Sequence, residues 1–236
     1  MKRRRRGAFR DQSDSAFSAI LARLCDDCGA LAAALVDPGG ETVDYAGLLD
    51  PYEIKVVAAE WRIVLAVVHE SRLPGFRTVA SLTVRAKRRS YFIEAMPDGY
   101  AIALRLPRHC FNVSRRALTQ AIRDLAREAA LTRPETRAEV HWARVRVRTP
   151  ASSRLLRRPD AIWVNDDWSP LTILGRYQAR DLSRAELGYL ARLASGAEVL
   201  LVREPLGVWF IDNPAALAAE VASEGVLQHE PPALKP

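Results

Sequence analysis

The sequence has no apolar run long enough to cross a membrane, and it contains few of the residues that usually carry chemistry. A membrane-spanning helix needs roughly 18 or more consecutive apolar residues, and no stretch of the 236-residue chain approaches this. Cysteine occurs three times and histidine four times. The basic run at 2–6 is followed by charged residues where an export signal would need an apolar segment. We therefore expect a cytoplasmic protein.

Three motifs that position common enzyme chemistries are absent. The chain has no Gly-x-x-x-x-Gly-Lys-Ser/Thr loop, no Gly-x-Ser-x-Gly turn and no His-Glu-x-x-His helix. In the second half, Asp166 and Asp167 beside Asn165 could bind a divalent ion, but adjacent acids of this kind are typical of a turn. The sequence thus predicts a protein that is not an enzyme, with no cofactor and no catalytic residue, and an enzyme in the second half that uses Asp166 and Asp167 is the alternative.

The cysteines allow a metal site as an alternative to ordinary packing. Three thiols and one imidazole are sufficient ligands for tetrahedral zinc, and they are Cys25, Cys28, His109 and Cys110. Cys28 also falls on the apolar stripe of a predicted helix, and cytosolic cysteines are commonly small core residues. We expect the cysteines to pack in the core, with zinc or a redox pair as the alternative.

Charge is distributed unevenly along the chain, which carries a net charge of +7. Residues 11–70 hold eleven acidic and three basic side chains, whereas residues 71–134 hold four acidic and thirteen basic ones. Such asymmetry steers association with a charged partner surface. The basic residues expected to make this contact are Arg85, Lys87, Arg88 and Arg89, and a solvated loop is the alternative interpretation. Residues 2–6 could bind nucleic acid or anionic lipid, although such a run is also typical of a disordered terminus.

The spacing of apolar residues and turn residues predicts eight elements in the first half of the chain. The first helix is expected to be capped by Ser13 or Asp14 and to end at Gly29. Turns rich in glycine and aspartate separate the strands. The expected elements are a helix at 13–28, strands at 30–36 and 42–45, a helix at 51–70, strands at 77–85, 91–96 and 100–106, and a helix from 112 or 114 to 131.

The long helix at 51–70 has the best start signal and an unusual apolar pattern. Asp50 can cap it, Pro51 suits its first position, and Glu53 stands where a capping box needs its acid. Its apolar residues form two stripes, the first with Ile54, Val57, Trp61, Val64, Leu65 and Val68, the second with Val56, Ile63 and Val67. One sheet cannot cover both stripes, so this helix is either central to a core or in contact with a partner.

The order of these elements resembles the roadblock family of dynein light chains and bacterial small-GTPase regulators. The likeness lies in the element order, in the apolar strand and Gly-rich hairpin after the first helix, and in the Asp98-Gly99 turn. It implies an α/β (α+β) fold: a roadblock/profilin-like α-β-β-α-β-β-β-α layer with an antiparallel five-stranded sheet. The long helix would cover one face of that sheet, and the two terminal helices would cover the other.

The resemblance also implies a function. Family members look like dimers that pair through the long helix and the neighbouring strand and present a platform to a Ras-like GTPase or a motor chain. The residues that match this surface are Val57, Trp61, Val64, Leu65 and Val68. The chain would then be a homodimeric, non-catalytic regulatory or scaffold protein that acts on the switch loops of a GTPase. The alternative is a nucleic-acid-binding protein that uses the arginine tail and basic strand faces.

The second half of the sequence resembles no family that we recognise. We expect a tail at 1–12, a roadblock-like domain at 13–133, a small α+β domain at 134–227 and a tail at 228–236. A strand near 145–147 alternates valine with Arg144, Arg146 and Arg148, and Trp142 lies on its basic side. The other expected elements are strands at 161–164 and 171–179, a helix opened by a Ser183–Glu186 capping box and ended by Gly196, a hairpin at 197–202 and 208–211, and a last helix from 213.

Overall fold

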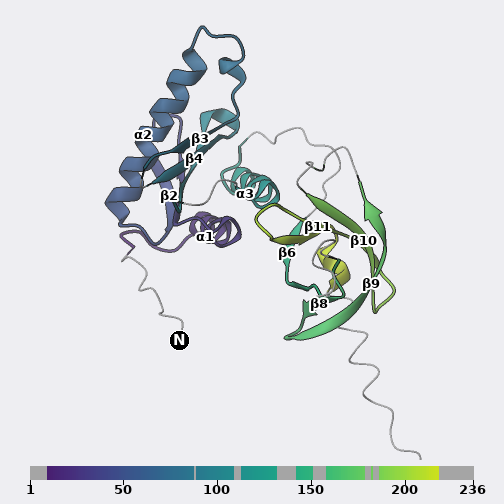
Figure 1. Cartoon of the computed structure of the whole chain (residues 1–236). Helices are drawn as coiled ribbons and strands as arrows, with labels where there is room; N and C mark the ends of the chain where they lie inside the picture. The colour runs from purple at the N-terminus through teal and green to yellow at the C-terminus, as the bar shows by residue number, and fades with distance from the viewer. Residues whose placement is uncertain are drawn as a thin grey trace, which may run out of the picture. The chain divides into compact units, whose positions relative to one another are not determined.

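In the computed structural model of the chain, the described residues are 10–87, 89–108, 113–131, 142–150, 158–178, 182 and 186–217. The chain forms two compact units, Met1–Arg137 and Ala138–Pro236 (Figure 1). Among the described residues, no helix is both long and apolar enough to cross a membrane.

The first unit is a five-stranded antiparallel sheet between two layers of helices. Its strands lie in the order β2-β1-β5-β4-β3. The long helix α2 lies on one face, and α1 and α3 lie together on the other (Figure 1). This is the layered fold that the roadblock resemblance implied. The elements are α1 (Ala16–Cys28), β1 (Ala32–Val36), β2 (Thr42–Gly47), α2 (Pro51–Glu70), β3 (Ser81–Arg85), β4 (Ser90–Ala95), β5 (Ala101–Leu106) and α3 (Arg115–Glu128).

The cap of α1 lies one or two residues after the predicted positions. Ser15, rather than Ser13 or Asp14, caps the helix, because its hydroxyl accepts a hydrogen bond of 3.1 Å from the Ser18 backbone N–H. The Ser18 hydroxyl in turn accepts a hydrogen bond from the Ser15 N–H, which completes a capping box. Gly29 ends the helix in the left-handed region, as predicted.

The β1–β2 pair closes at a position that only glycine can occupy. Gly47 has φ +125°, and a Cβ atom there would lie 2.5 Å from both the Ala32 Cα and the Leu31 carbonyl oxygen. Any side chain at this position would push the end of β2 away from β1. The close approach brings the Leu48 N–H within 2.7 Å of the Leu31 carbonyl, just before α2 begins.

The described part of the second unit is mainly an antiparallel sheet. Its strands lie in the order β6-β12-β11-β10-β9-β8-β7. Tyr189, Leu201 and Trp209 contribute to one buried cluster on this sheet. The strands are β6 (Ala143–Val145), β7 (Val147–Arg148), β8 (Ala161–Val164), β9 (Asp167–Tyr177), β10 (Leu187–Leu193), β11 (Glu198–Arg203) and β12 (Trp209–Ile211).

The prediction of a helix between Ser183 and Gly196 is wrong, because Leu187–Leu193 is strand β10. The apolar residues of this segment fit both the helical period and the strand period. Leu187, Leu190 and Ala191 are spaced as on a helix, whereas Tyr189, Ala191 and Leu193 alternate as on a strand and are buried. The neighbouring strands β9 and β11 both pair with this segment, so the sheet decides the outcome.

A buried acid lies between the sheet and α3. Glu94 of β4 is 9% exposed, and one of its carboxylate oxygens lies 3.8 Å from the Arg115 guanidinium. Burial raises the pKa of Glu94, against the opposing effects of Arg115 and a hydrogen bond from Ser81. The native state therefore binds this proton more tightly than the unfolded state does.

This raised pKa predicts how Glu94→Gln changes stability with pH. The native pKa lies above the ordinary value of 4.5, so the wild type loses stability as pH rises from that value through the native pKa. The amide cannot ionise, so the variant escapes this loss. We expect thermal melts to show the variant gaining on the wild type between pH 4 and pH 8, by on the order of 2 °C. Exposed Glu128→Gln is the control, and a pH-independent difference for Glu94→Gln would contradict the prediction.

Candidate functional site

Helix α2 begins as the sequence predicts. The Glu53 carboxylate, which was predicted to join a capping box, bonds to Arg89 instead. Asp50 accepts hydrogen bonds from the N–H groups of Tyr52 at 2.9 Å and Glu53 at 3.4 Å. The Glu53 carboxylate accepts from the Arg89 guanidinium at 3.1 Å, in the connection between β3 and β4. The start of α2 is therefore linked to the connection between β3 and β4, here called the basic hairpin for its Arg85, Lys87 and Arg89.

The first apolar stripe of α2 packs against the sheet of its own chain. Ile54 and Ala58 are fully buried in a cluster with residues of β1, β2 and β5. Val57 is 7% exposed and Leu65 is 2% exposed. Two of the five predicted interface residues are thus already covered within one chain. A second molecule could not contact them without moving α2.

Two more of the predicted residues, Trp61 and Val68, are half-buried. Trp61 packs on Tyr91 of β4 with ring centroids 5.1 Å apart, and the Arg105 guanidinium lies 5.0 Å from the centre of the Tyr91 ring. Arg105 is 8% exposed, and burial lowers its pKa. Trp61 therefore belongs to a stack beneath the helix, and a charge placed there would disturb the fold as well as any interface.

The outward face of α2 is mostly apolar, and exposed Glu60 lies within it. Ile63 and Val67 are 63% and 61% exposed, and they lie one helical turn apart. Val64, the fifth predicted interface residue, lies on this side as well. We call this set the exposed stripe, and its members are Tyr52, Val56, Ile63, Val64 and Val67. The sequence identified Val56, Ile63 and Val67 as a second stripe but nominated the first stripe as the contact.

Apolar exposure continues past the end of α2. A short 3₁₀ turn, Phe76–Thr78, follows the helix, and the His69 ring lies 2.7 Å from the Val79 carbonyl and holds this turn to α2. Leu73 and Phe76 are both exposed there. On β3, the last strand of the sheet on this side, Val84 is exposed too.

The basic residues predicted to make electrostatic contacts lie at the connection between β3 and β4. Arg85, Lys87 and Arg89 are exposed, and Arg88 lies outside the described residues. A hydrogen bond with the Tyr91 side chain and the charge of Glu53 raise the pKa of Arg89. This end of the unit therefore presents positive charge beside the exposed stripe.

The cysteine pair is buried in α1. Cys25 and Cys28 are both buried in the core. Burial, with smaller effects of Cys28 and Asp26, raises the pKa of Cys25 to about 12, so this thiol stays protonated at physiological pH. His109 and Cys110 lie outside the described residues. Within the described ranges, no group of three potential ligands could hold a metal.

The predicted basic strand is divided at Arg146 into two short strands, β6 and β7, which pair with β12 and β8 respectively, and its arginines have partners. Arg146 lies 4.5 Å from the centre of the Trp163 ring. Arg148 pairs with Asp160 at 3.1 Å. Asn165 and Asp166 have positive φ and form the tight turn between β8 and β9. The sequence favoured such a turn over a site for a divalent ion. Residues 2–6 lie outside the described part of the chain.

Similarity to solved structures covers about half of this chain. The MglB protein of Myxococcus xanthus is 16% identical, with 50% of this chain and 98% of that one covered and a TM-score of 0.44. The gliding protein MglB of Thermus thermophilus is 17% identical, with 49% and 89% covered and a TM-score of 0.43. A Roadblock/LC7 domain of Streptomyces avermitilis is 16% identical, with 50% and 96% covered and a TM-score of 0.39. No protein-family model and no curated protein matches the sequence. The roadblock-type fold of the first unit is evident from its own element and strand order.

Two matched truncations test whether Leu65 of α2 belongs to the core. Leu65→Ala should lower the free energy of unfolding by about 2–5 kcal/mol, because it opens a cavity under the helix. Leu48→Ala removes the same atoms from a 41% exposed position and should cost within about 1 kcal/mol. Urea denaturation followed by circular dichroism measures both. Equal losses would contradict the assignment.

Proposed function

We propose that this chain is a cytoplasmic, non-catalytic regulator or scaffold that forms a homodimer and docks a Ras-like small GTPase. The exposed stripe of α2 carries this proposal. The roadblock resemblance suggests the class of partner. Within the described residues, no group of three or more His, Cys, Asp or Glu side chains could hold a metal ion.

The exposed stripe supports self-association because it places large apolar side chains in water over several helical turns. Ile63 and Val67 lie at its centre, and Leu73 and Phe76 extend it beyond the helix. Exposed clusters of large apolar side chains mark interaction sites on soluble proteins. A second copy of the chain would bring an identical stripe, and two-fold symmetric pairing is the commonest way to bury one.

Strand β3 adds a second reason to place the interface here. It is the last strand of the sheet on this side, and Thr83, Val84 and Arg85 are exposed. An edge strand presents hydrogen-bonding groups that another strand can use. Pairing of β3 with its copy would extend the sheet across the dimer while the two α2 helices bury their stripes.

Ile63→Glu should separate the dimer. A carboxylate in the middle of the exposed stripe would have to lose its water on association, so we expect the dissociation constant to rise on the order of 100-fold or more. The fold should be unaffected, because the side chain is 63% exposed. Sedimentation velocity gives the mass, and circular dichroism checks the fold.

Leu48→Glu is the matched control, because it makes the same kind of change at an exposed position outside α2. It should leave the mass unchanged. A wild type that stays monomeric at high concentration would contradict the dimer. A dimer that survives Ile63→Glu would contradict its placement on α2.

Docking of a GTPase is tested with the Ras-like GTPases encoded in the same genome, each loaded with GDP or with a non-hydrolysable GTP analogue. We expect one of them to bind, and the double variant Arg85→Gln/Lys87→Gln to weaken binding on the order of threefold to tenfold, with a smaller dependence on salt. Calorimetry at two ionic strengths measures both effects.

The control removes the same number of charges from the helical layer on the other face of the sheet. Arg23 and Arg127 both pair with Asp124 there, at 2.6 Å and 3.8 Å. Arg23→Gln/Arg127→Gln should bind as the wild type does. Equal losses for the two double variants would mean that binding depends on net charge and not on the basic hairpin.

A further inference from the structure

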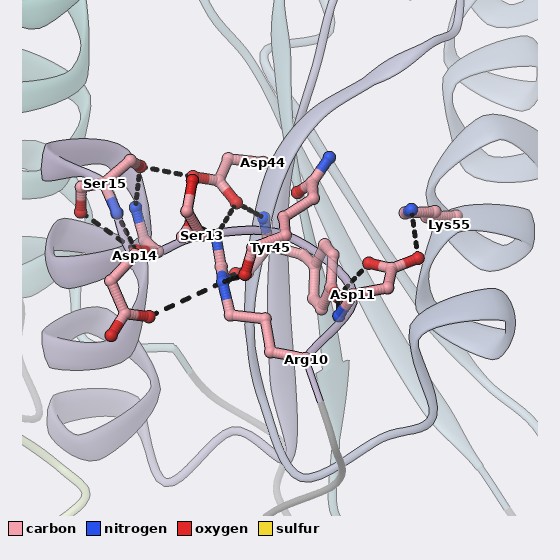
Figure 2. A network of polar contacts seen from close by, with 10 residues as sticks. Arg10, Asp11, Ser13, Asp14, Ser15, Asp44, Tyr45 and Lys55 are labelled. Carbon is pink, nitrogen blue, oxygen red and sulfur yellow. Dashed lines mark hydrogen bonds and ion pairs between the residues drawn. The ribbon is translucent and has the colours of Figure 1, made fainter.

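The segment at residues 10–15, here called the strap, lies along β2 at the edge of the sheet opposite to β3 (Figure 2). The sequence assigned residues 10–12 to a basic tail, yet Arg10 and Asp11 make specific contacts with residues more than 30 positions away. The Arg10 guanidinium also donates to the carbonyl groups of Gln12 and Ser13, at 3.1 Å each, which folds the strap into a compact turn.

Two side chains occupy the hydrogen-bonding groups of Tyr45 on the free side of β2, one from the strap and one from β2 itself. The Tyr45 carbonyl accepts a hydrogen bond from the Arg10 guanidinium. The Tyr45 N–H donates to the Asp44 carboxylate at 2.7 Å. An incoming strand would need both of these groups. In this structure, both are already satisfied by side chains.

Asp44 holds these contacts together. It is 4% exposed, and its carboxylate accepts from the Arg10 guanidinium and from the Ser15 hydroxyl. Ser15 is also the cap of α1, so one carboxylate joins the edge strand, the strap and a helix start. A charge this deeply buried is costly without its partner, and Arg10 supplies that partner.

Further contacts fix the strap to the helix layer. The Arg10 guanidinium carbon lies 4.9 Å from the centre of the Tyr45 ring, and the Lys55 ammonium lies 5.5 Å from it. The Asp11 carboxylate accepts from the Tyr45 hydroxyl and from Lys55 of α2, the latter at 2.7 Å. These two bonds lower the pKa of Asp11.

We infer that the strap closes the β2 edge to strand pairing and thereby confines self-association of the chain to its β3 side. An exposed edge strand is a template for further strands, and a sheet with two open edges can grow without limit. With one edge closed, pairing stops at two copies. The closure of β2 stands on the contacts above, and the restriction to a dimer rests on the proposed function.

The test is to open the strap and follow the mass. Arg10→Ala removes the bonds to Asp44 and to the Tyr45 carbonyl, and Arg23→Ala removes the same charge from an exposed pair with Asp124. In sedimentation velocity, Arg10→Ala should raise the weight-average mass about twofold or more over roughly a tenfold range of concentration. Arg23→Ala should match the wild type.

Two further variants separate this inference from the proposed dimer. In an Ile63→Glu background, which lacks the α2 contact, adding Arg10→Ala should convert monomers into dimers. Val43→Lys places a charge on the exposed part of β2, where edge lysines block pairing. Adding it to Arg10→Ala should restore the parental mass. If the wild type is monomeric, the proposed dimer fails, and Arg10→Ala alone is still expected to associate.

Arg10→Lys covers the case in which Arg10→Ala does not fold. It keeps the positive charge near Asp44 but loses the planar fork that reaches two acceptors at once, so it should associate to an intermediate extent. Parental mass for every folded Arg10 variant overturns the inference. Association that Val43→Lys does not reverse also overturns it, because pairing would then occur elsewhere.

Discussion

The packing of α2 on its sheet is the constraint from which the rest of the first unit follows. A helix can lay only one side on a sheet, and here the side with Ile54, Val57, Ala58 and Leu65 is buried. Everything apolar on the opposite side is left in water, including Ile63 and Val67. The fold therefore cannot hide its own long helix, and the surplus apolar surface is the feature that most favours a binding role.

The two edge strands of the first unit's sheet, β2 and β3, differ in the groups that surround them, so the two sides of the unit are not equivalent. At β2, a buried carboxylate and an arginine occupy the backbone groups of Tyr45. At β3, exposed side chains lie beside the apolar end of α2 and the basic hairpin. Exposed apolar side chains, an edge strand and positive charge thus lie together on the β3 side. On the β2 side, the polar groups form hydrogen bonds and ion pairs with one another.

Local signals in the sequence were sufficient for most of the fold. Asp50-Pro51 placed the start of α2, and alternating residues placed strands β8, β11 and β12. Periodicity alone could not say which stripe of α2 meets the sheet, so Val57 and Leu65 were nominated for an interface although they are core residues. β10 was predicted as a helix because its residues fit both periods, and only the pairing with β9 and β11 decides between them. Arg10 was read as part of a tail because its partners are far away in the sequence and leave no local trace.

Gly47 has a consequence for how this protein can vary in evolution. Both Asp44 and the start of α2 lie within a few residues of the point where β2 comes closest to β1, and no Cβ fits there. A mutation at that codon would misplace the strand end and the helix start together. Descendants of this sequence can vary their surface loops more readily than they can exchange this one amino acid.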